Sequence, residues 1–407
     1  MKLKIKKYSI DEMLLQSSIF IFFTITILST SFYYKYFVDT YKVFLLISVV
    51  LLFVREIFSI YNFKTVLLLL FLSILLFILL PVIDGVSQWV FPIGLVFIYC
   101  LRNVSFEKLS KSIIPISLIV LLFVVISSKL GIIENYSVIS SGRLRYFIGF
   151  RYALFSSTIM TNITILWCNL KKEKISIFEL IFLLIVNYWI FLNTDSRLTF
   201  FTTVVVILIT IVYKYYQSFF KILEKLSIFL IPSYLYSFFI SFYLSYYYDP
   251  SVEWQYRLNE VLGTRLYLGY KSLTNYGFSF LGKSIKWVGS GLDAYGNKST
   301  FSYNYVDSLY IQILQRYGII FTLIILFILT VLMYKLYKNK QIFLILMLSI
   351  TAFHGIIDDL ILYLHYNSLW LLAGSIIYKN YSYLEDNSVS NIRVITQNVR
   401  IKIPNKI

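Results

Sequence analysis

The chain has few charged residues, few cysteines and few histidines. Only 14% of its 407 residues are charged, against roughly 25% in an ordinary soluble domain, and it has 2 cysteines and 2 histidines. This composition excludes a disulfide scaffold. The sequence also lacks a nucleotide-binding loop, a zinc-binding signature and a serine nucleophile elbow. We therefore expect that the chain does not use a cytoplasmic nucleotide directly.

Apolar residues are abundant instead. They make up 59% of the chain, with 36 Phe and 36 Tyr, and the mean hydropathy is +0.76. A soluble core could not hide so much apolar surface, since even large soluble proteins cover themselves with polar side chains. The composition therefore excludes a soluble enzyme and a disordered protein. It predicts an all-α, polytopic integral membrane protein.

Twelve apolar stretches are candidates for membrane-spanning helices, which need about 20 residues each. They cover residues 13–34, 43–54, 65–83, 86–101, 112–130, 150–169, 176–193, 198–213, 226–247, 308–333, 341–357 and 361–378. Four lysines precede the first stretch, as in a signal peptide, but no small-residue cleavage site follows, so we expect an uncleaved helix. Cys100 and Cys168 lie at the ends of apolar runs without metal-ligand spacing, and we expect thiols that face lipid or core.

The distribution of Lys and Arg predicts the orientation. If the N-terminus is cytoplasmic and the stretches alternate, the seven inner segments hold 23 of the 37 basic residues. Six of the others fall in the long outer segment 248–307, where the positive-inside rule has little force. The net charge of +17 is thus explained without a nucleic-acid partner. We expect both termini inside, nine helices in 1–247, three in 308–378 and a cytoplasmic tail in 379–407.

The outer segment 248–307 is the largest part outside the predicted helices. It contains 7 of the 15 glycines, a run of tyrosines, Trp254 and Trp287. Long loops of this kind are often functional, and we expect substrate binding here. Part of it, around 257–280, has helical periodicity typical of short helices on a membrane surface.

Arginines gather on the predicted outer side, against the usual trend. Arg143, Arg145 and Arg151 enter the sixth stretch, where they could clamp an anion through bidentate hydrogen bonds or anchor the chain to lipid headgroups. Arg197 follows Asp195 in a tight turn, where it could form a local ion pair or point into an outer cavity.

Two more arginines lie in different sequence surroundings. Arg265 lies in the polar outer segment, where solvation alone would account for it. Arg316 lies inside an apolar stretch and must snorkel, find a partner or line a wet cavity.

Three acidic and histidine positions complete the candidates. Asp307 begins the tenth stretch, where it is either a helix-capping carboxylate or a functional group. His354 and Asp358 are four residues apart and share a helix face. They could line the outer cavity, pack a helix end or bind a divalent cation, but this spacing is generic.

Four stretches together resemble the O-antigen and capsular polysaccharide polymerases (Wzy type), which are related to the O-antigen ligases. They are Arg145 to Phe150 with Gly149, Thr194-Asp195-Ser196-Arg197, Gly263-Thr264-Arg265 with the later Gly277 and Gly282, and Asp307-Ser308-Leu309-Tyr310 followed by Tyr317-Gly318. The end of the chain, with Asp358 and Tyr366-Asn367-Ser368, is similar in layout. Asp307 stands where a ligase would have a histidine, which favours a polymerase.

The resemblance implies a glycosyltransferase of the bacterial cytoplasmic membrane, with no cofactor and no metal. It would transfer a growing glycan from undecaprenyl pyrophosphate onto a lipid-linked repeat unit at the outer face. A flippase and a chain-length regulator are possible protein partners. The implied catalytic residues are Asp307 and Asp358. The implied pyrophosphate-binding residues are Arg143, Arg145, Arg151, Arg197, Arg265 and Arg316, and the implied sugar-binding residues are Trp254, Trp287, Tyr310 and His354.

Two alternatives stay open. A ligase would carry out similar chemistry on a different acceptor. A lipid-linked oligosaccharide flippase or other transporter would be expected to show paired repeats, helices broken near mid-membrane and charges along the whole path, and none of these is evident in the sequence.

Overall fold

The computed structural model describes residues 10–59, 89–140 and 142–376. It is mostly helical, and six of its helices are long and apolar enough to cross a membrane. They are Ile10–Leu28, Phe106–Lys129, Ala153–Lys174, Ile177–Thr194, Arg197–Tyr215 and Leu309–Lys338. The bent pair Ile222–Leu230 and Ser233–Tyr246 adds a seventh if it forms one span. The expected all-α, multi-pass membrane class is confirmed at this level, whereas the count of twelve is not.

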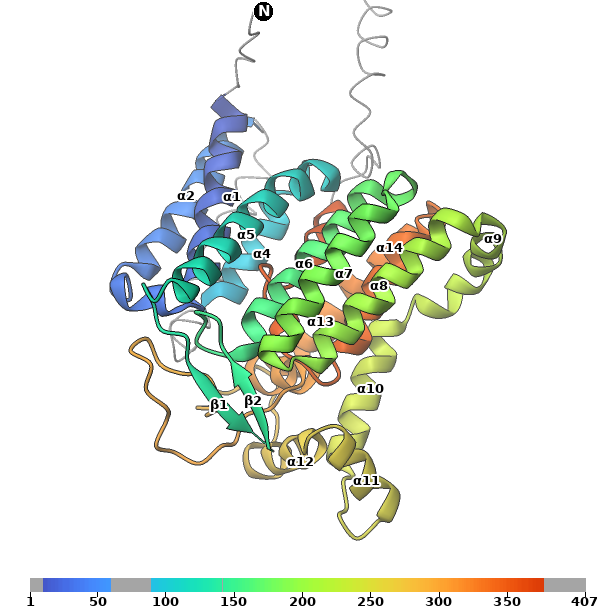
Figure 1. The fold of residues 1–407 in the computed structure, drawn as a ribbon. Helices are drawn as coiled ribbons and strands as arrows, with labels where there is room; N and C mark the ends of the chain where they lie inside the picture. The colour runs from blue at the N-terminus through green and yellow to red at the C-terminus, as the bar shows by residue number, and fades with distance from the viewer. Residues whose placement is uncertain (1–9, 60–88, 141, 377–407) are drawn as a thin grey trace, which may run out of the picture.

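The elements follow one another in a mainly antiparallel arrangement (Figure 1). The first part contains α1 (Ile10–Leu28), α2 (Tyr41–Ser59), α4 (Val90–Cys100), α5 (Phe106–Lys129), β1 (Ser137–Ser140), β2 (Arg143–Tyr146), α6 (Ala153–Lys171), α7 (Ile177–Thr194) and α8 (Arg197–Tyr215). The second part contains α9 (Gln217–Leu226), α10 (Ser233–Tyr246), α11 (Glu253–Val261), α12 (Arg265–Tyr276), α13 (Leu309–Lys338) and α14 (Ile342–His354). The expected stretch 65–83 and tail 379–407 lie outside the described residues.

Local sequence explains where several helices begin. Ser105 accepts a hydrogen bond from the backbone N–H of Lys108 at the start of α5. Ser176 and Glu179 form a reciprocal capping box at the start of α7. Both devices satisfy N–H groups that a helix leaves without partners in its first turn.

Two ends of the bundle can be distinguished in Figure 1. The hairpin of β1 and β2 lies at one end together with α11 and α12, and we call this the hairpin end. Two chain segments that were predicted to lie on the outer side meet at the hairpin end. The backbone N–H of Arg151, before α6, donates a hydrogen bond to the carbonyl of Thr30, after α1, at 2.9 Å. Segments predicted to face inside meet at the other end, where Arg102 pairs with Glu56 at 2.8 Å. The alternation of the segments across a membrane, and the side that each end faces, stay predictions.

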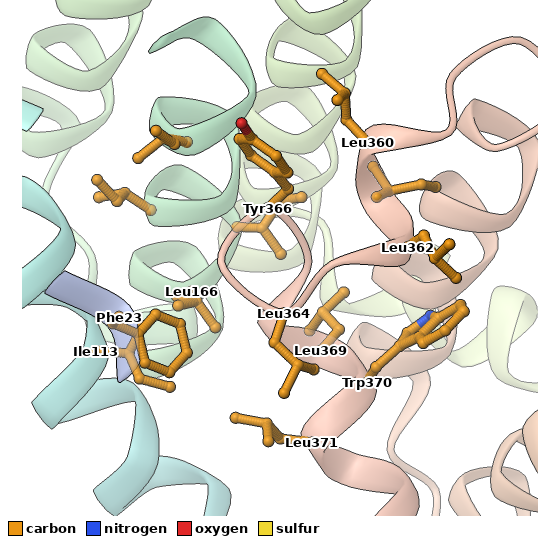
Figure 2. Close-up of a cluster of buried hydrophobic side chains, with 14 of the residues drawn as sticks. Phe23, Ile113, Leu166, Leu360, Leu362, Leu364, Tyr366, Leu369, Trp370 and Leu371 are labelled. Carbon is orange, nitrogen blue, oxygen red and sulfur yellow. The ribbon is translucent and has the colours of Figure 1, made fainter. Parts of the chain in front are cut away.

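A helix was expected over 361–378, and in its described part, residues 361–376, irregular buried structure replaces it. A 3-10 turn at Leu360–Leu362 leads through a short link into a 3-10 segment at Ser368–Ile376. Figure 2 shows their apolar side chains among those of α1, α5 and α6. Asn162 of α6 holds the backbone, because its Nδ2 donates to Ser368 Oγ and its Oδ1 accepts from the Ser368 N–H, both at 3.0 Å. Non-helical backbone inside a membrane protein requires such partners.

Helix α13 is interrupted at Gly318, where φ is 88° and ψ is 173°. Residues 279–283 of the long outer segment fill the break. The Lys283 N–H donates to the Gln315 carbonyl at 2.9 Å, and the Ile319 N–H donates to the Ser279 carbonyl at 3.0 Å. The outer segment thus supplies the hydrogen bonds that the helix loses at its break.

Replacement of Gly318 by alanine should destabilise the protein strongly. The new Cβ would overlap the Gly282 nitrogen and the Phe280 carbonyl oxygen, and the positive φ adds strain. We expect a loss of about 2 to 4 kcal/mol in the free energy of unfolding, seen as a lower thermal midpoint in detergent. Gly131→Ala is the matched control, since Gly131 has φ of 73° but nothing within 4 Å, and it should cost only about 1 kcal/mol. Equal midpoints for the two variants would contradict a filled break.

Candidate functional site

A cavity of about 390 Å³ lies at the hairpin end. Five segments distant in sequence contribute to it: the entry to α6, the start of α12, residues 287–292, residues 303–307 and residues 357–360. Its charged lining residues are Arg151, Arg265, Asp307, Asp358 and Asp359. Four of these five were predicted from the sequence, and the structure brings them together.

Asp307 lies at the end of an extended segment that precedes α13. Tyr303 Oη donates to its Oδ2 at 3.3 Å, and Arg265 Nε lies 3.5 Å from the same oxygen. Burial raises the pKa of Asp307 to about 6, although Arg265 opposes the shift. The N-cap of α13 is Ser308, so Asp307 is part of the cavity rather than the cap. At neutral pH this carboxyl group is mostly ionised.

Asp359 is a buried acid beside it. Its carboxyl group accepts a hydrogen bond from Tyr305 Oη at 2.6 Å. Burial raises the pKa of Asp359 to about 8, and the nearby charges of Asp358 and Asp307 act in the same direction. The side chain is therefore mainly neutral at pH 7 and can donate a proton, while Asp307 can accept one.

Asp358 is held by two hydrogen bonds. Its Oδ1 accepts from the Leu360 N–H at 2.9 Å, and its Oδ2 lies 3.0 Å from His354 Nε2. His354 is 5% exposed and does not line the cavity. It lies behind Asp358, where its Nδ1 is 2.8 Å from Thr202 Oγ1.

A second cavity of about 240 Å³ adjoins the first, and the charged side chains that line it are basic. The two share the lining residues Tyr152, Tyr303 and 289–291. Arg145 and Lys298 are the charged lining residues of the second cavity. Arg145 is fixed in place because its Nε donates to the Thr194 carbonyl at the end of α7, at 2.8 Å. The result is two adjoining cavities, one rich in carboxyl groups and the other basic.

Arg151 joins the cavity to the bundle. Its Nη1 donates to the Leu292 carbonyl at 2.9 Å and its Nη2 to the Ser29 carbonyl at 2.6 Å. Its guanidinium also stacks on Tyr34, 4.8 Å from the ring centre. Burial lowers the pKa of Arg151. The side chain therefore positions the cavity wall and adds positive charge to it.

Three predicted arginines lie outside both cavities. Arg143 and Arg197 both form ion pairs with the carboxylate of Asp195, at 2.5 and 3.3 Å. For Arg197 this is the local ion pair, one of the two possibilities that the sequence offered. Arg316 stacks on Trp287, 4.7 Å from the ring centre, and Trp287 in turn lines the first cavity.

The predicted sugar-binding residues are dispersed. Trp287 lines the carboxylate-rich cavity. Trp254 lies on α11, is 54% exposed and lines neither cavity. Tyr310 is buried, and its hydroxyl donates to the Ala352 carbonyl at 2.7 Å. Tyr310 is therefore a residue of the hydrophobic core of the bundle and not a sugar-binding residue.

Several site residues were missed from the sequence. They are Tyr152, Lys298, Tyr303, Tyr305 and Asp359. One signal was available for the tyrosines, since residues 303, 305 and 307 alternate and would share one side of an extended segment. No such pattern identifies Tyr152 or Lys298, because only the fold brings them to the cavity.

The arrangement combines an ionised carboxylate, a neutral carboxyl group and fixed cations in one site. Such a set can remove a proton from a hydroxyl group and stabilise negative charge on a leaving group. In residues 10–59, 89–140 and 142–376, no three His, Cys, Asp or Glu side chains converge as metal ligands.

The Asp359→Asn variant should be more stable than the wild-type protein as the pH rises toward 8. The folded state keeps a proton on Asp359 between about pH 4 and 8 that the unfolded chain releases, so the free energy of unfolding of the wild type falls as pH rises. Asparagine keeps the acceptor for Tyr305 and carries no charge. Thermal unfolding in detergent should show the variant gaining roughly 2 to 4 kcal/mol over the wild type between pH 5 and 8. Asp39→Asn, at an exposed carboxylate, is the control, and parallel pH profiles for all three proteins would contradict the shift.

Comparison of the chain with protein-family models, with curated proteins and with solved structures finds no match. The function therefore has to be argued from the two adjoining cavities and their charged residues.

Proposed function

We propose that the chain is a polysaccharide polymerase that transfers a growing glycan from undecaprenyl pyrophosphate onto a lipid-linked repeat unit. The observation that carries the proposal is the juxtaposition of the two cavities, one with Asp307, Asp358 and Asp359 and the other with Arg145 and Lys298. A glycosyl transfer from a lipid pyrophosphate needs both parts: a base for the attacking hydroxyl group and positive charge for the leaving group.

In this proposal the basic cavity receives the pyrophosphate of the donor. Arg145 and Lys298 neutralise the negative charge that develops as the bond between sugar and phosphate breaks. The acceptor sugar occupies the carboxylate-rich cavity against the face of Trp287. Its hydroxyl group is deprotonated by a carboxylate of that cavity, Asp307 or Asp358. Arg265 keeps Asp307 in place through the 3.5 Å ion pair.

The proposed polymerase would be an integral protein of a membrane. The bundle would span the bacterial cytoplasmic membrane with both termini inside and the hairpin end outside. The excess of Lys and Arg in the predicted inner segments supports this orientation. A flippase would deliver the lipid-linked units to the outer leaflet, and a chain-length regulator is a further expected partner.

Removal of Arg145 or Arg265 should abolish long polysaccharide. Arg145→Ala takes positive charge from the basic cavity, and Arg265→Ala frees Asp307, so we expect a loss of at least about 100-fold in polymer. Asp307→Asn should also reduce transfer while donor binding persists. Arg257→Ala is the control, because Arg257 is exposed on α11 and pairs with Glu253 four residues earlier. Gel profiles of surface glycan, normalised to membrane protein, give the readout. Normal ladders from both arginine variants would contradict the proposed anion site.

Deletion of the gene separates the three transfer classes. A polymerase mutant should leave single repeat units on the terminal lipid anchor. Full polymers stranded on undecaprenyl pyrophosphate would indicate a ligase, and units trapped in the cytoplasmic leaflet would indicate a flippase. Mass analysis of the extracted lipid-linked glycans gives the answer.

A further inference from the structure

Tyr152, Tyr303 and residues 289–291 line both the carboxylate-rich cavity and the basic cavity. They mark the place where the two cavities adjoin, and we call them the shared boundary. Residues 289–291 are a Gly-Ser-Gly segment of the long outer segment. The shared boundary has no charged side chain, although charged side chains line the cavity on either side of it.

Hydrogen bonds fix the Gly-Ser-Gly segment at both of its ends. Before it, the Val288 N–H donates to Asn304 Oδ1 at 2.6 Å, and the Asn304 N–H donates to the Val288 carbonyl at 3.1 Å. After it, the Leu292 N–H donates to the Arg151 carbonyl at 2.9 Å, and Arg151 Nη1 donates to the Leu292 carbonyl at 2.9 Å. Three residues between two such pairs have little freedom to move, so binding a ligand here costs little ordering of the chain.

The Gly-Ser-Gly segment presents polar groups that the protein itself does not use. In the residues that the structure describes, the backbone N–H groups of 289–291 have no protein acceptor. Ser290 is exposed, and its hydroxyl group can donate and accept hydrogen bonds. The absence of side chains at Gly289 and Gly291 lets a ligand approach this backbone closely. Hydroxyl groups of a sugar need hydrogen-bond partners of this kind when they leave water.

The two glycines of the segment have different surroundings. A Cβ at Gly289 would lie 3.2 Å from the ring of Tyr305, the tyrosine that donates to Asp359. A Cβ at Gly291 would have only the Arg151 carbonyl oxygen and Tyr152 Cβ near it, each at 4.0 Å. The protein therefore has room for alanine at position 291, where the new methyl group would take up space beside Tyr152 at the shared boundary.

We infer that the shared boundary binds the sugar that is bonded to the donor pyrophosphate, with Ser290 and the backbone N–H groups of 289–291 as its hydrogen-bond partners. The inference rests on the proposed function. In that function, the anomeric carbon of this sugar is bonded to a pyrophosphate oxygen in the basic cavity. The acceptor hydroxyl group reaches the same carbon from the carboxylate-rich cavity. One sugar meets both conditions only where the two cavities adjoin.

Binding of two lipids by the full-length protein in nanodiscs tests the subsite. One lipid is undecaprenyl pyrophosphate alone, and the other is the same lipid with a repeat unit attached. Ser290→Ala removes one hydrogen-bonding group, so it should weaken binding of the repeat-unit lipid by about 3- to 10-fold. Gly291→Ala fills space that the sugar needs, so it should weaken this binding by at least about tenfold. Both variants should bind the bare lipid within about twofold of the wild type, because its pyrophosphate contacts Arg145 and Lys298.

Ser302→Ala is the matched control, since Ser302 is an exposed serine of the same outer segment and lines neither cavity. Thermal midpoints close to that of the wild type show that each variant is folded. Equal losses for both lipids, or wild-type affinity for the repeat-unit lipid in both variants, would overturn the subsite and leave the proposed function intact. Wild-type protein that binds neither lipid would overturn the proposed function and the subsite with it.

Discussion

Three carboxyl groups around one buried cavity cost electrostatic free energy, and much of the hairpin end compensates for it. Low exposure removes water from Asp358 and Asp359, so their charges repel one another with little screening. A different neighbouring group stabilises each of the three carboxyl groups. Asp307 has Arg265, Asp359 has the Tyr305 hydroxyl and keeps its proton, and Asp358 has His354. Different protonation states in one site are what acid and base chemistry at a single pH requires.

The fold holds these groups by irregular backbone rather than by regular helices. Asp358 and Asp359 follow α14 in a segment that Asn162 and its neighbours tie to α6. Asp307 precedes α13, whose first part ends at Gly318. Regular helices would direct their side chains toward lipid or toward one another, whereas these breaks turn backbone and carboxylates toward a common space. The membrane interior tolerates the breaks because the protein itself supplies the missing hydrogen bonds.

Sequence reasoning identified the class of the protein and most charged cavity residues. Arginines and acids in or beside apolar stretches are costly, so Arg145, Asp307 and Asp358 were recognisable without coordinates. Arg265 lies in the polar outer segment, and only the family resemblance indicated it. Hydropathy could not distinguish a spanning helix from the buried irregular structure after residue 360, because both are apolar. Nor could it separate Tyr310, which packs in the core, from a tyrosine that lines a cavity. Such distinctions depend on contacts between residues that are far apart in the sequence. His354 and Thr202, for example, are in hydrogen-bond contact although they are 152 residues apart.

The filled break in α13 divides the long outer segment into a constrained part and a permissive part. Residues 279–283 are bonded to helix backbone, so any insertion there would displace the helix that leads from Asp307. At the turn of Asp293 and Asn297 both side chains are exposed, and the Asp293 carboxylate accepts hydrogen bonds from the Asn297 N–H and Nδ2. Changes of length at that turn leave the carboxylates in place while they reshape the rim beside Lys298. If the proposed polymerase function is correct, substitutions and length changes that alter glycan specificity are expected at that turn rather than at the break.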